Sequence, residues 1–145
     1  MGRPKGFDEQ EVTRAAVALF AGRAYDGLSV DDLVTGLGVH RNSLYKTFGS
    51  KRGLYLTALR WYLANEVEPL LARAAASDQP RSVLLEAGET LDLLLLAAAE
   101  QAPLDAEVGA LIRTTLSRLD AVLGQSPANE LLGERLRARL RTDDR

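Results

Sequence analysis

Apolar residues recur at intervals of three and four along this chain, the spacing that places side chains on one face of an α-helix. The first apolar face consists of Val12, Ala15, Ala16, Leu19 and Phe20. Asp8 precedes it as a candidate N-cap, with Glu11 as capping-box partner and Phe7 and Val12 spaced for a hydrophobic staple. The pattern predicts a helix that begins after Asp8 and ends in a connection at residues 24–27.

Two shorter helices are predicted next, separated by a glycine. Ser29 can cap the first of them, with Asp32 as its carboxylate partner three residues later. Its inward-facing apolar positions are Leu33, Val34 and Leu37. Gly38 permits a positive φ and a sharp change of direction, and the second short helix is predicted at 40–47. Residues 29–51 therefore indicate paired helices joined by a tight turn.

The second short helix is predicted to present a polar face. Leu44 and Phe48 are four residues apart and can anchor the helix to a core. With these two side chains facing the core, the other faces of the helix carry His40, Arg41, Ser43 and Lys46. Arginine can bond guanine bidentately, asparagine can pair with adenine, and Ser, Tyr and Lys can hold phosphates. Such a face suits the DNA major groove, although this helix taken alone favours an ordinary polar surface.

A fourth helix is expected to begin after Ser50, which can cap it. Its first turn carries Lys51 and Arg52, and a helix N-terminus beside a lysine attracts phosphate. The alternative is that these two basic residues are ordinary surface residues, whose charges interact mildly unfavourably with the helix dipole. The apolar pattern continues toward Val67, and Pro69 is expected to kink or stop the helix.

Three further helices are predicted in the rest of the chain. One begins near Pro80 and includes 91–99, which is apolar nearly all round and is expected to be buried. Another runs from Asp105 to a stop at Gly124, and the last opens at Ser126. The sequence thus predicts an all-α fold.

Several side chains in this second part carry alternative interpretations. Trp61 and Tyr62 can line a ligand cavity, but aromatic residues at helical spacing favour plain core. Two sets of charges are interpreted as solvated: Glu86, Glu89, Asp92 and Glu100, with a cationic ligand as the alternative, and Arg135, Arg137, Arg139 and Arg141. The last two helices carry apolar seams at Val108, Ile112, Leu116, Leu119 and Leu123 and at Leu132, Leu136 and Leu140. These seams are candidates for a dimer interface, with intramolecular packing as the competing reading.

Composition and charge limit the classes of function that this chain can have. The chain has no cysteine and one histidine, His40, which excludes thiolate metal sites and thiol redox chemistry and leaves no recognisable catalytic set. We expect no enzyme activity, no cofactor and no metal site. The net charge of −2 is unevenly placed, with +3 on residues 1–60 and −5 on residues 61–145, which suits a polyanion-binding end. Arg3 and Lys5 lie in a short basic arm that can enter a minor groove, or be a plain disordered terminus.

Residues 7–62 resemble the N-terminal domain of TetR-family transcriptional regulators. Gly38-Val39, Ser43-Leu44-Tyr45, Phe48 and Ser50-Lys51 match that family's helix-turn-helix in order and spacing. The resemblance implies two domains, a DNA-binding domain at 1–52 and a helical effector and dimerisation domain at 53–145.

The resemblance also implies roles for individual residues. Its DNA-binding candidates are Arg3, Lys5, Ser29, His40, Arg41, Asn42, Ser43, Tyr45, Lys46 and Lys51. Those at 40–43 start the recognition helix and meet base edges or nearby phosphates, whereas Tyr45, Lys46 and Lys51 reach the phosphate backbone. Two positions depart from the family pattern. Ala24 replaces a glycine, where a left-handed conformation would cost about 1 kcal/mol, and His40 replaces the usual Ser or Thr cap.

The function implied by the resemblance is that of a cytoplasmic, dimeric repressor that binds double-stranded operator DNA and is released by a small-molecule effector. No signal peptide and no membrane-spanning run is found in the sequence. The second part has room for only three helices after the fourth, so we expect a reduced effector pocket or dimer face, a constitutive regulator, or a truncated gene product. The alternative function is a helical interaction or ligand-sequestering module with a vestigial DNA-binding region.

Overall fold

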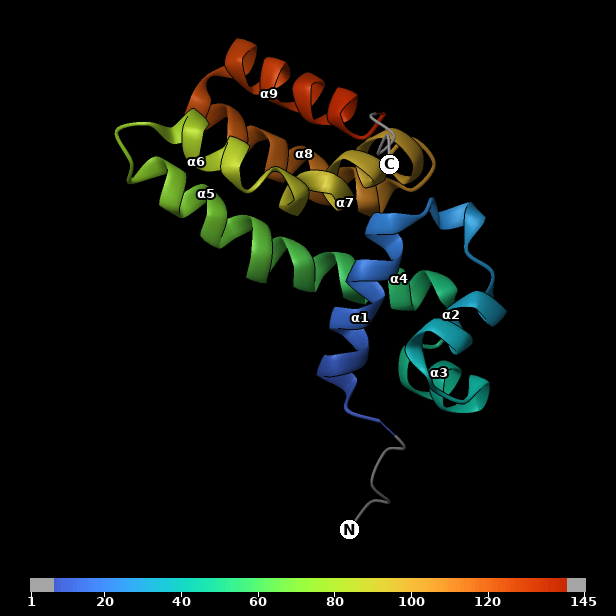
Figure 1. Ribbon diagram of the computed structural model, residues 1–145. Helices are drawn as coiled ribbons and strands as arrows, with labels where there is room; N and C mark the ends of the chain where they lie inside the picture. Colours follow the sequence, from blue (N-terminus) through green and yellow to red (C-terminus); the bar gives the residue numbers. More distant parts are fainter. Residues whose placement is uncertain (1–6, 141–145) are drawn as a thin grey trace, which may run out of the picture. The chain divides into compact units, whose positions relative to one another are not determined.

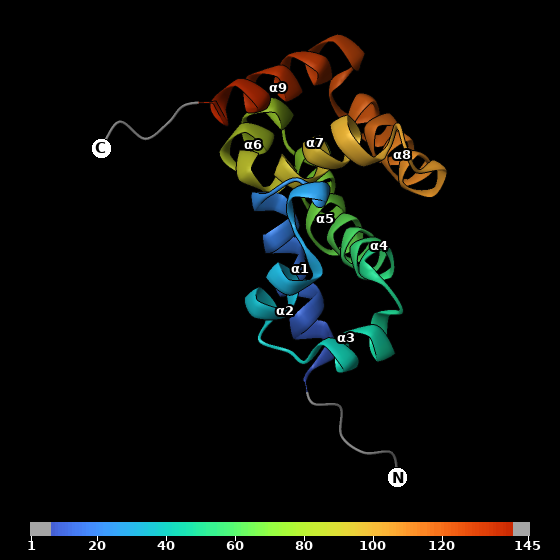
Figure 2. The same cartoon turned by 90° about the vertical axis from the view of Figure 1, so that its right-hand side faces the viewer.

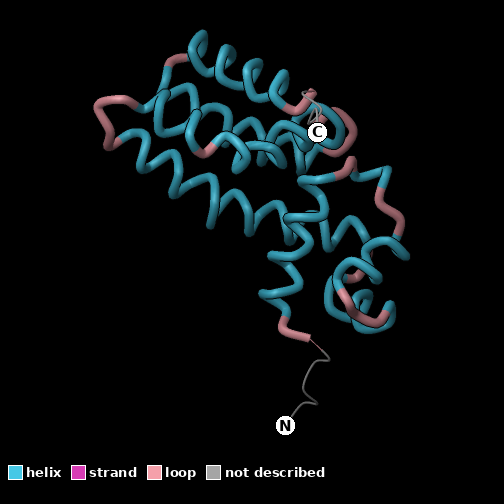
Figure 3. The backbone as a smooth tube through the Cα atoms, viewed as in Figure 1, coloured by secondary structure: helices cyan, strands magenta, loops and turns pink. Residues whose placement is uncertain are grey.

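The computed structural model describes residues 7–140, and this range contains helices and loops without any strand (Figures 1 and 3). The all-α fold predicted from the sequence is confirmed. The chain divides into two compact units, one ending at Tyr62 and the other beginning at Leu63. We call residues 7–62 the head and residues 63–140 the body. Within the described range, no helix combines the length and the apolar character that crossing a bilayer requires.

The head contains four α-helices and one 3₁₀ turn among its described residues. They are α1 (Glu9–Gly22), the 3₁₀ turn η1 (Tyr25–Gly27), α2 (Val30–Leu37), α3 (Arg41–Phe48) and α4 (Lys51–Tyr62). The most extensive helix pairing in the head is between α1 and α4, and α3 packs against both α2 and α4. Buried side chains from all four helices form the core, including Phe20, Leu33, Leu44, Leu54 and Leu59. The boundary between the two units follows Tyr62, because α4 packs along α1 and so completes the core of the head.

The helix starts predicted at Asp8 and Ser29 are present, with a complete capping box at Ser29 and only the Asp8 half of the box predicted with Glu11. The Asp8 carboxylate accepts hydrogen bonds from the backbone N–H of Gln10 at 2.9 Å and of Glu11 at 3.3 Å. Ser29 and Asp32 form a complete capping box, in which the Ser29 hydroxyl accepts from the Asp32 N–H at 3.0 Å and the Asp32 carboxylate accepts from the Ser29 N–H at 2.9 Å. Each bond satisfies a backbone group that the helix leaves unpaired.

The connection between α1 and α2 differs from the expectation for Ala24. Ala24 has φ −54° and ψ 146°, so the expected cost of a left-handed alanine does not arise. The chain turns instead through η1, where an aromatic cluster holds the connection. Tyr25 and Tyr55 have ring centroids 4.9 Å apart, and Phe20 and Tyr55 have theirs 5.0 Å apart, both edge to face. Such pairs add to the stabilisation from burial.

The body contains more helical segments than the sequence predicted. They are the π turn η2 (Leu63–Val67), α5 (Glu68–Ala75), α6 (Pro80–Glu86), the 3₁₀ turn η3 (Gly88–Leu91), α7 (Asp92–Leu96), the π turn η4 (Ala97–Gln101), α8 (Ala106–Leu123) and α9 (Gln125–Ala138). α5 packs against α6 and α8, and α9 packs against α8 and α7 (Figures 1 and 2).

Two predictions for the body are tested by the helix bounds. Of the two outcomes expected at Pro69, a kink or a stop, the stop does not occur: α4 passes into the π turn η2, and Pro69 lies in the first turn of α5, which follows η2 directly. The single helix predicted from Pro80 is broken at Ala87, whose φ of −101° and ψ of 27° lie outside the α-helical region. The break separates α6 from η3 and α7. Consequently, five α-helices follow α4 in the part of the chain that the structure describes.

The interpretation of Asp92, Arg135 and Arg139 as solvated is wrong. The side chain of Asp92 on α7 is only 15% exposed, and its carboxylate accepts two hydrogen bonds from Arg135 on α9, at 2.6 and 3.0 Å. Arg139 Nη1 lies 3.0 Å from the same carboxylate. The hydrogen bonds that Arg135 donates to the Asp92 carboxylate raise the pKa of Arg135 above its already high ordinary value. Arg135 reaches Asp92 by crossing Gly88, where a Cβ atom would lie 3.2 Å from Arg135 Cδ.

The two candidate dimer seams have different surroundings. Val108, Ile112 and Leu119 of α8 are buried inside the body. Leu136 in α9 and Leu140, which follows α9, are 54% and 77% exposed, respectively. The α8 seam therefore serves intramolecular packing, whereas the α9 seam leaves apolar surface at its C-terminal end.

Candidate nucleic-acid interface

The interface is built on the joint between α2 and α3. Gly38 ends α2 with φ 66° and ψ 35°, a left-handed conformation that glycine adopts without the strain of a Cβ atom. Its N–H donates to the carbonyl of Val34 at 3.0 Å, which closes the last turn of α2. Val39, Leu44 and Phe48 are buried and fix α3 from beneath. The sequence-predicted turn between paired helices is thus present.

The opposite side of α3 faces solvent. His40, Arg41, Asn42, Tyr45 and Lys46 are exposed, and Ser43 is half-buried. All these candidates lie along one short helix or at its N-cap, within eight residues of chain. His40 makes no side-chain capping bond, in agreement with its departure from the Ser or Thr expected there.

Arg41 has a partner that the sequence reasoning missed. Its Nη2 donates to Asp31 Oδ1, so the first residue of α3 is linked to the first turn of α2. The two residues are ten positions apart, and their opposite charges on either side of the turn were the available signal.

Lys51 points into the head instead of extending freely from α4. Its Nζ donates to the Tyr25 carbonyl at 2.6 Å and lies 4.1 Å from the centroid of the Tyr25 ring. Lys51 therefore links the N-terminus of α4 to η1. Ser29 is likewise engaged in the capping box of α2. Lys51 and Ser29 therefore both make contacts within the head that do not involve DNA.

A close backbone approach sets the joint between α3 and α4. A Cβ atom at Gly53 would lie 2.0 Å from the Phe48 carbonyl oxygen, so only glycine fits this position. Gly49 ends α3 with φ 82°, and the Ser50 hydroxyl accepts the Gly53 N–H at 2.9 Å. Ser50 was predicted as a cap, but the requirement for Gly53 was not. A glycine inside an otherwise helical pattern was its sequence signal.

The remaining candidates lie elsewhere. Arg3 and Lys5 fall outside the described residues. Tyr62 is 1% exposed and belongs to the core of the head, as favoured from the sequence. Trp61 is half-buried, with the guanidinium of Arg14 5.7 Å from its ring centroid.

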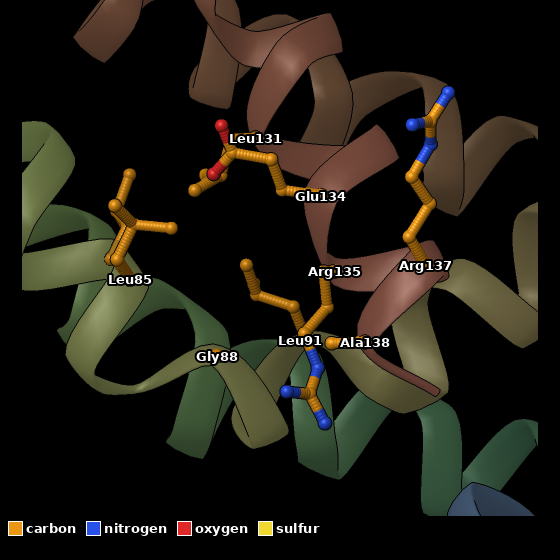
Figure 4. Close-up of a pocket in the computed structure, with 9 residues that line it drawn as sticks. Leu85, Gly88, Leu91, Leu131, Glu134, Arg135, Arg137 and Ala138 are labelled. Atoms are coloured by element: carbon orange, nitrogen blue, oxygen red, sulfur yellow. The ribbon is translucent and has the colours of Figure 1, made fainter. Parts of the chain in front are cut away.

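The body has a groove that is open to solvent. It has a volume of about 340 Å³ and lies between α6, η3 and α9 (Figure 4). Its lining residues are Leu84, Leu85, Gly88, Leu91, Leu131, Glu134, Arg135, Arg137 and Ala138. A second cavity of about 230 Å³ lies between α5 and α8, beside the ion pair of Glu68 and Arg118. Neither Trp61 nor Tyr62 lines these two cavities.

The paired helices and their exposed α3 face define a helix-turn-helix head. A family model described as bacterial regulatory proteins of the tetR family matches residues 12–58. This range covers most of the head, including both helices of the motif.

Two curated proteins and one solved structure are similar to this chain. The uncharacterized HTH-type transcriptional regulator YezE of Bacillus subtilis is 34% identical over 120 residues, which are 74% of this chain and 62% of the relative. The HTH-type transcriptional repressor BdcR of Escherichia coli is 38% identical over 79 residues, 54% of this chain and 40% of the relative. The chain thus spans about three fifths of the first relative's length and less of the second.

The third is a solved structure, a cysteine mutant of the TetR family transcriptional regulator CifR complexed with 26-bp double-strand operator DNA. It aligns with a TM-score of 0.70 and 26% sequence identity, covering 97% of this chain and 91% of that one. The chain belongs to the TetR family of bacterial regulatory proteins. The resemblance noted in the sequence is confirmed.

Proposed function

We propose that this protein is a sequence-specific transcriptional regulator that binds double-stranded operator DNA, acts as a repressor in the cytoplasm and catalyses no reaction. The observation that carries the proposal is the α3 helix, which is anchored by Leu44 and Phe48 and exposes a face rich in hydrogen-bond donors. A helix of this kind fits the major groove, where base edges present distinct patterns of donors and acceptors. The operator complex of CifR supports the proposal by analogy.

The proposed contacts divide into two groups. Arg41 and Asn42 read base edges, with His40 and Ser43 beside them at the start of α3. Tyr45, Lys46 and Lys51 hold phosphates, and Arg3 and Lys5 add minor-groove contacts. Base contacts carry specificity, whereas phosphate contacts supply affinity that falls with salt.

A homodimer would present two heads to two half-sites. The exposed Leu136, in α9, and Leu140, just after it, support the end of α9 as part of the dimer surface, because removing exposed apolar side chains from water favours association. In a two-fold dimer, both copies use the same surface to form the interface. The two half-sites of the operator are then related by the same symmetry and form a palindrome.

Release by a small molecule is the regulatory part of the proposal. The groove between α6, η3 and α9 supports it, since its volume of about 340 Å³ is within the usual size of small-molecule sites and most of its lining residues are apolar. An effector lowers operator affinity only if it binds the non-operator arrangement more tightly.

Selection of bound sequences from random DNA by the purified protein tests this function. We expect a palindromic consensus that binds at least about 10³-fold more tightly than competitor DNA at physiological salt. Affinity for both should fall steeply as salt rises. Binding without any sequence preference would overturn the proposal and favour the interaction or ligand-sequestering module.

A further inference from the structure

The second groove of the body, between α5 and α8, combines a polar end with apolar walls. Its volume is about 230 Å³, and the polar side chains in its lining are those of Glu68 and Arg118. The remaining lining residues are apolar: Leu71, Ala72, Ala75, Ala121 and Val122. We propose that this groove binds a small neutral molecule that carries a carboxamide at one end and a short apolar chain at the other.

The Glu68 carboxylate supplies an unused hydrogen-bond acceptor. Arg118 Nη2 lies 2.6 Å from Glu68 Oε1, whereas Glu68 Oε2 is buried and accepts no hydrogen bond within residues 7–140. A buried carboxylate oxygen without a donor is unfavourable, so a donor that reaches it regains a charge-assisted hydrogen bond. Because Glu68 lines the groove, a small rotation of its carboxylate brings Oε2 to a donor on a molecule that lies there.

Arg118 supplies donors beside that acceptor. Its side chain is 63% exposed, and the polar contact recorded for it within residues 7–140 is the one between Nη2 and Glu68. A guanidinium carries five N–H donors, so Arg118 retains donors for an acceptor on the same bound molecule. The polar end of the groove therefore presents an acceptor and donors next to each other.

The two opposite charges favour a neutral ligand. An ammonium group placed at Glu68 would also lie close to the Arg118 guanidinium, and a carboxylate placed at Arg118 would lie close to the Glu68 carboxylate. A carboxamide has no charge and combines N–H donors with a carbonyl acceptor, which matches the polar end. The volume is below the usual range for drug-sized ligands, so the apolar chain is short.

Three probes of equal chain length test the proposal on the full protein: pentanamide, pentanoate and pentylamine, at pH 7, where the last two are charged. We expect pentanamide to bind saturably with a Kd of about 1 mM or lower. It should bind at least about tenfold more tightly than the other two, because each of them loses a hydrogen bond to a charged side chain and meets a like charge.

Methyl NMR spectra locate the binding. Pentanamide should shift the methyl signals of Ala72, Ala75 and Ala121, which line the groove between α5 and α8. The methyl signal of Ala138, which lines the groove between α6, η3 and α9, should not shift. Equal binding of the three probes, no saturation by pentanamide, or shifts confined to Ala138 would overturn the inference.

Glu68→Gln reverses the chemistry of the polar end. The Gln oxygen would accept from Arg118, so its amide NH₂ group would take the place of Oε2 and present a donor. We expect pentanamide affinity to fall about tenfold and pentanoate to become the tightest probe. Glu86→Gln removes the same charge from an exposed position of α6 and should leave the order of the probes unchanged. An unchanged order in Glu68→Gln would contradict the inference.

Ala121→Leu provides a test that keeps both Glu68 and Arg118. Ala121 is exposed on α8, so the fold should be retained, which circular dichroism checks, while the larger side chain fills the groove. Pentanamide binding should be lost, and its persistence would overturn the inference. The probe experiments contain no DNA, so their outcome is independent of whether the protein selects an operator.

Discussion

The Lys51 side chain contacts Tyr25 within the head and is also proposed to bind a DNA phosphate. Lys51→Met keeps the apolar stem but removes the bond to the Tyr25 carbonyl and the cation-π contact. We expect the free energy of unfolding to fall by about 1–2 kcal/mol and binding to weaken similarly on all DNA sequences. Urea unfolding and DNA titration measure the two effects.

Lys46→Met is the matched control for that variant. Lys46 is exposed on α3, and no side-chain contact is recorded for it in the described range. Its replacement should weaken DNA binding while changing stability by less than about 0.5 kcal/mol. Equal stability losses in the two variants would contradict the internal role of Lys51.

Asp32 makes the stability of the head depend on pH. The pKa of Asp32 is lowered, first by the hydrogen bond from the Ser29 backbone N–H and then by the hydrogen bond with the Ser29 side chain; desolvation opposes them, and the charge of Arg23 lowers the pKa least. A lowered pKa in the folded state gives stability that is fully present above the unfolded pKa, about 3.9, and is lost as pH falls through the folded value.

The corresponding test compares Asp32→Asn with the unaltered protein below about pH 4. The variant should be less stable at neutral pH and should lose less stability on acidification, because its amide does not titrate in this range. Unfolding curves at a series of pH values give the comparison. Asp26→Asn should retain the full acid dependence, and an Asp32→Asn profile parallel to that of the unaltered protein would contradict the assignment.

At the scale of elements, Asp92 connects α7 to α9. Asp92→Ala leaves two partly buried guanidiniums without their shared carboxylate. We expect a loss of about 2–3 kcal/mol in the free energy of unfolding, somewhat below the cost for fully buried pairs because the groups retain some solvent.

Glu86→Ala supplies the comparison for Asp92→Ala. Glu86 is exposed at the end of α6 and lacks a recorded partner within the described range, so its removal should change stability by about 0.5 kcal/mol or less. Thermal unfolding of both variants measures the difference. A loss in Asp92→Ala no larger than in Glu86→Ala would show that the cluster contributes little.

The elements that sequence reasoning predicted are those whose determinants are close together in the chain. The capping box joins residues three positions apart, and Gly38 acts on its own turn, so both could be identified locally. The break at Ala87 could not, because its surroundings include Arg135 crossing Gly88 from α9. Arg135 and Asp92 are 43 positions apart, and a helical pattern contains no information about such partners. The arginines of α9 were therefore assigned to solvent.

The candidate site was predictable to a similar degree. The spacing of apolar core residues among polar residues correctly predicted which face of α3 is exposed. The partners of those residues depend on how α2, η1 and α4 approach α3, as with Asp31 for Arg41 and Tyr25 for Lys51. Sequence spacing gave the reading face but not the contacts that restrain it.

At the scale of the whole molecule, the proposed dimer depends on α9. Leu136→Glu places a charge on an apolar residue that is already exposed, so the fold should be retained. If α9 lies at the dimer surface, the dimer dissociation constant should rise at least about tenfold. Sedimentation velocity measures the dimer population, and circular dichroism checks helix content.

Leu104→Glu is the control for dimerisation. Leu104 is 77% exposed in the loop before α8 and lies outside the α9 seam. Its substitution should leave the dimer population unchanged. An equal effect of both variants, or no effect of Leu136→Glu on association, would exclude the α9 seam as the interface.

The contact of Gly53 with the Phe48 carbonyl also bears on how operator preference can change. The close approach of backbone atoms at this joint limits the angles that α3 and α4 can adopt, and it involves no side chain of residues 41–43. Residues 41–43 can therefore vary while the frame that presents them stays constant. A library randomised at those three positions, with Gly53 retained, offers a direct route to heads with new DNA targets, whereas substitution of Gly53 alters the presentation of every one of them.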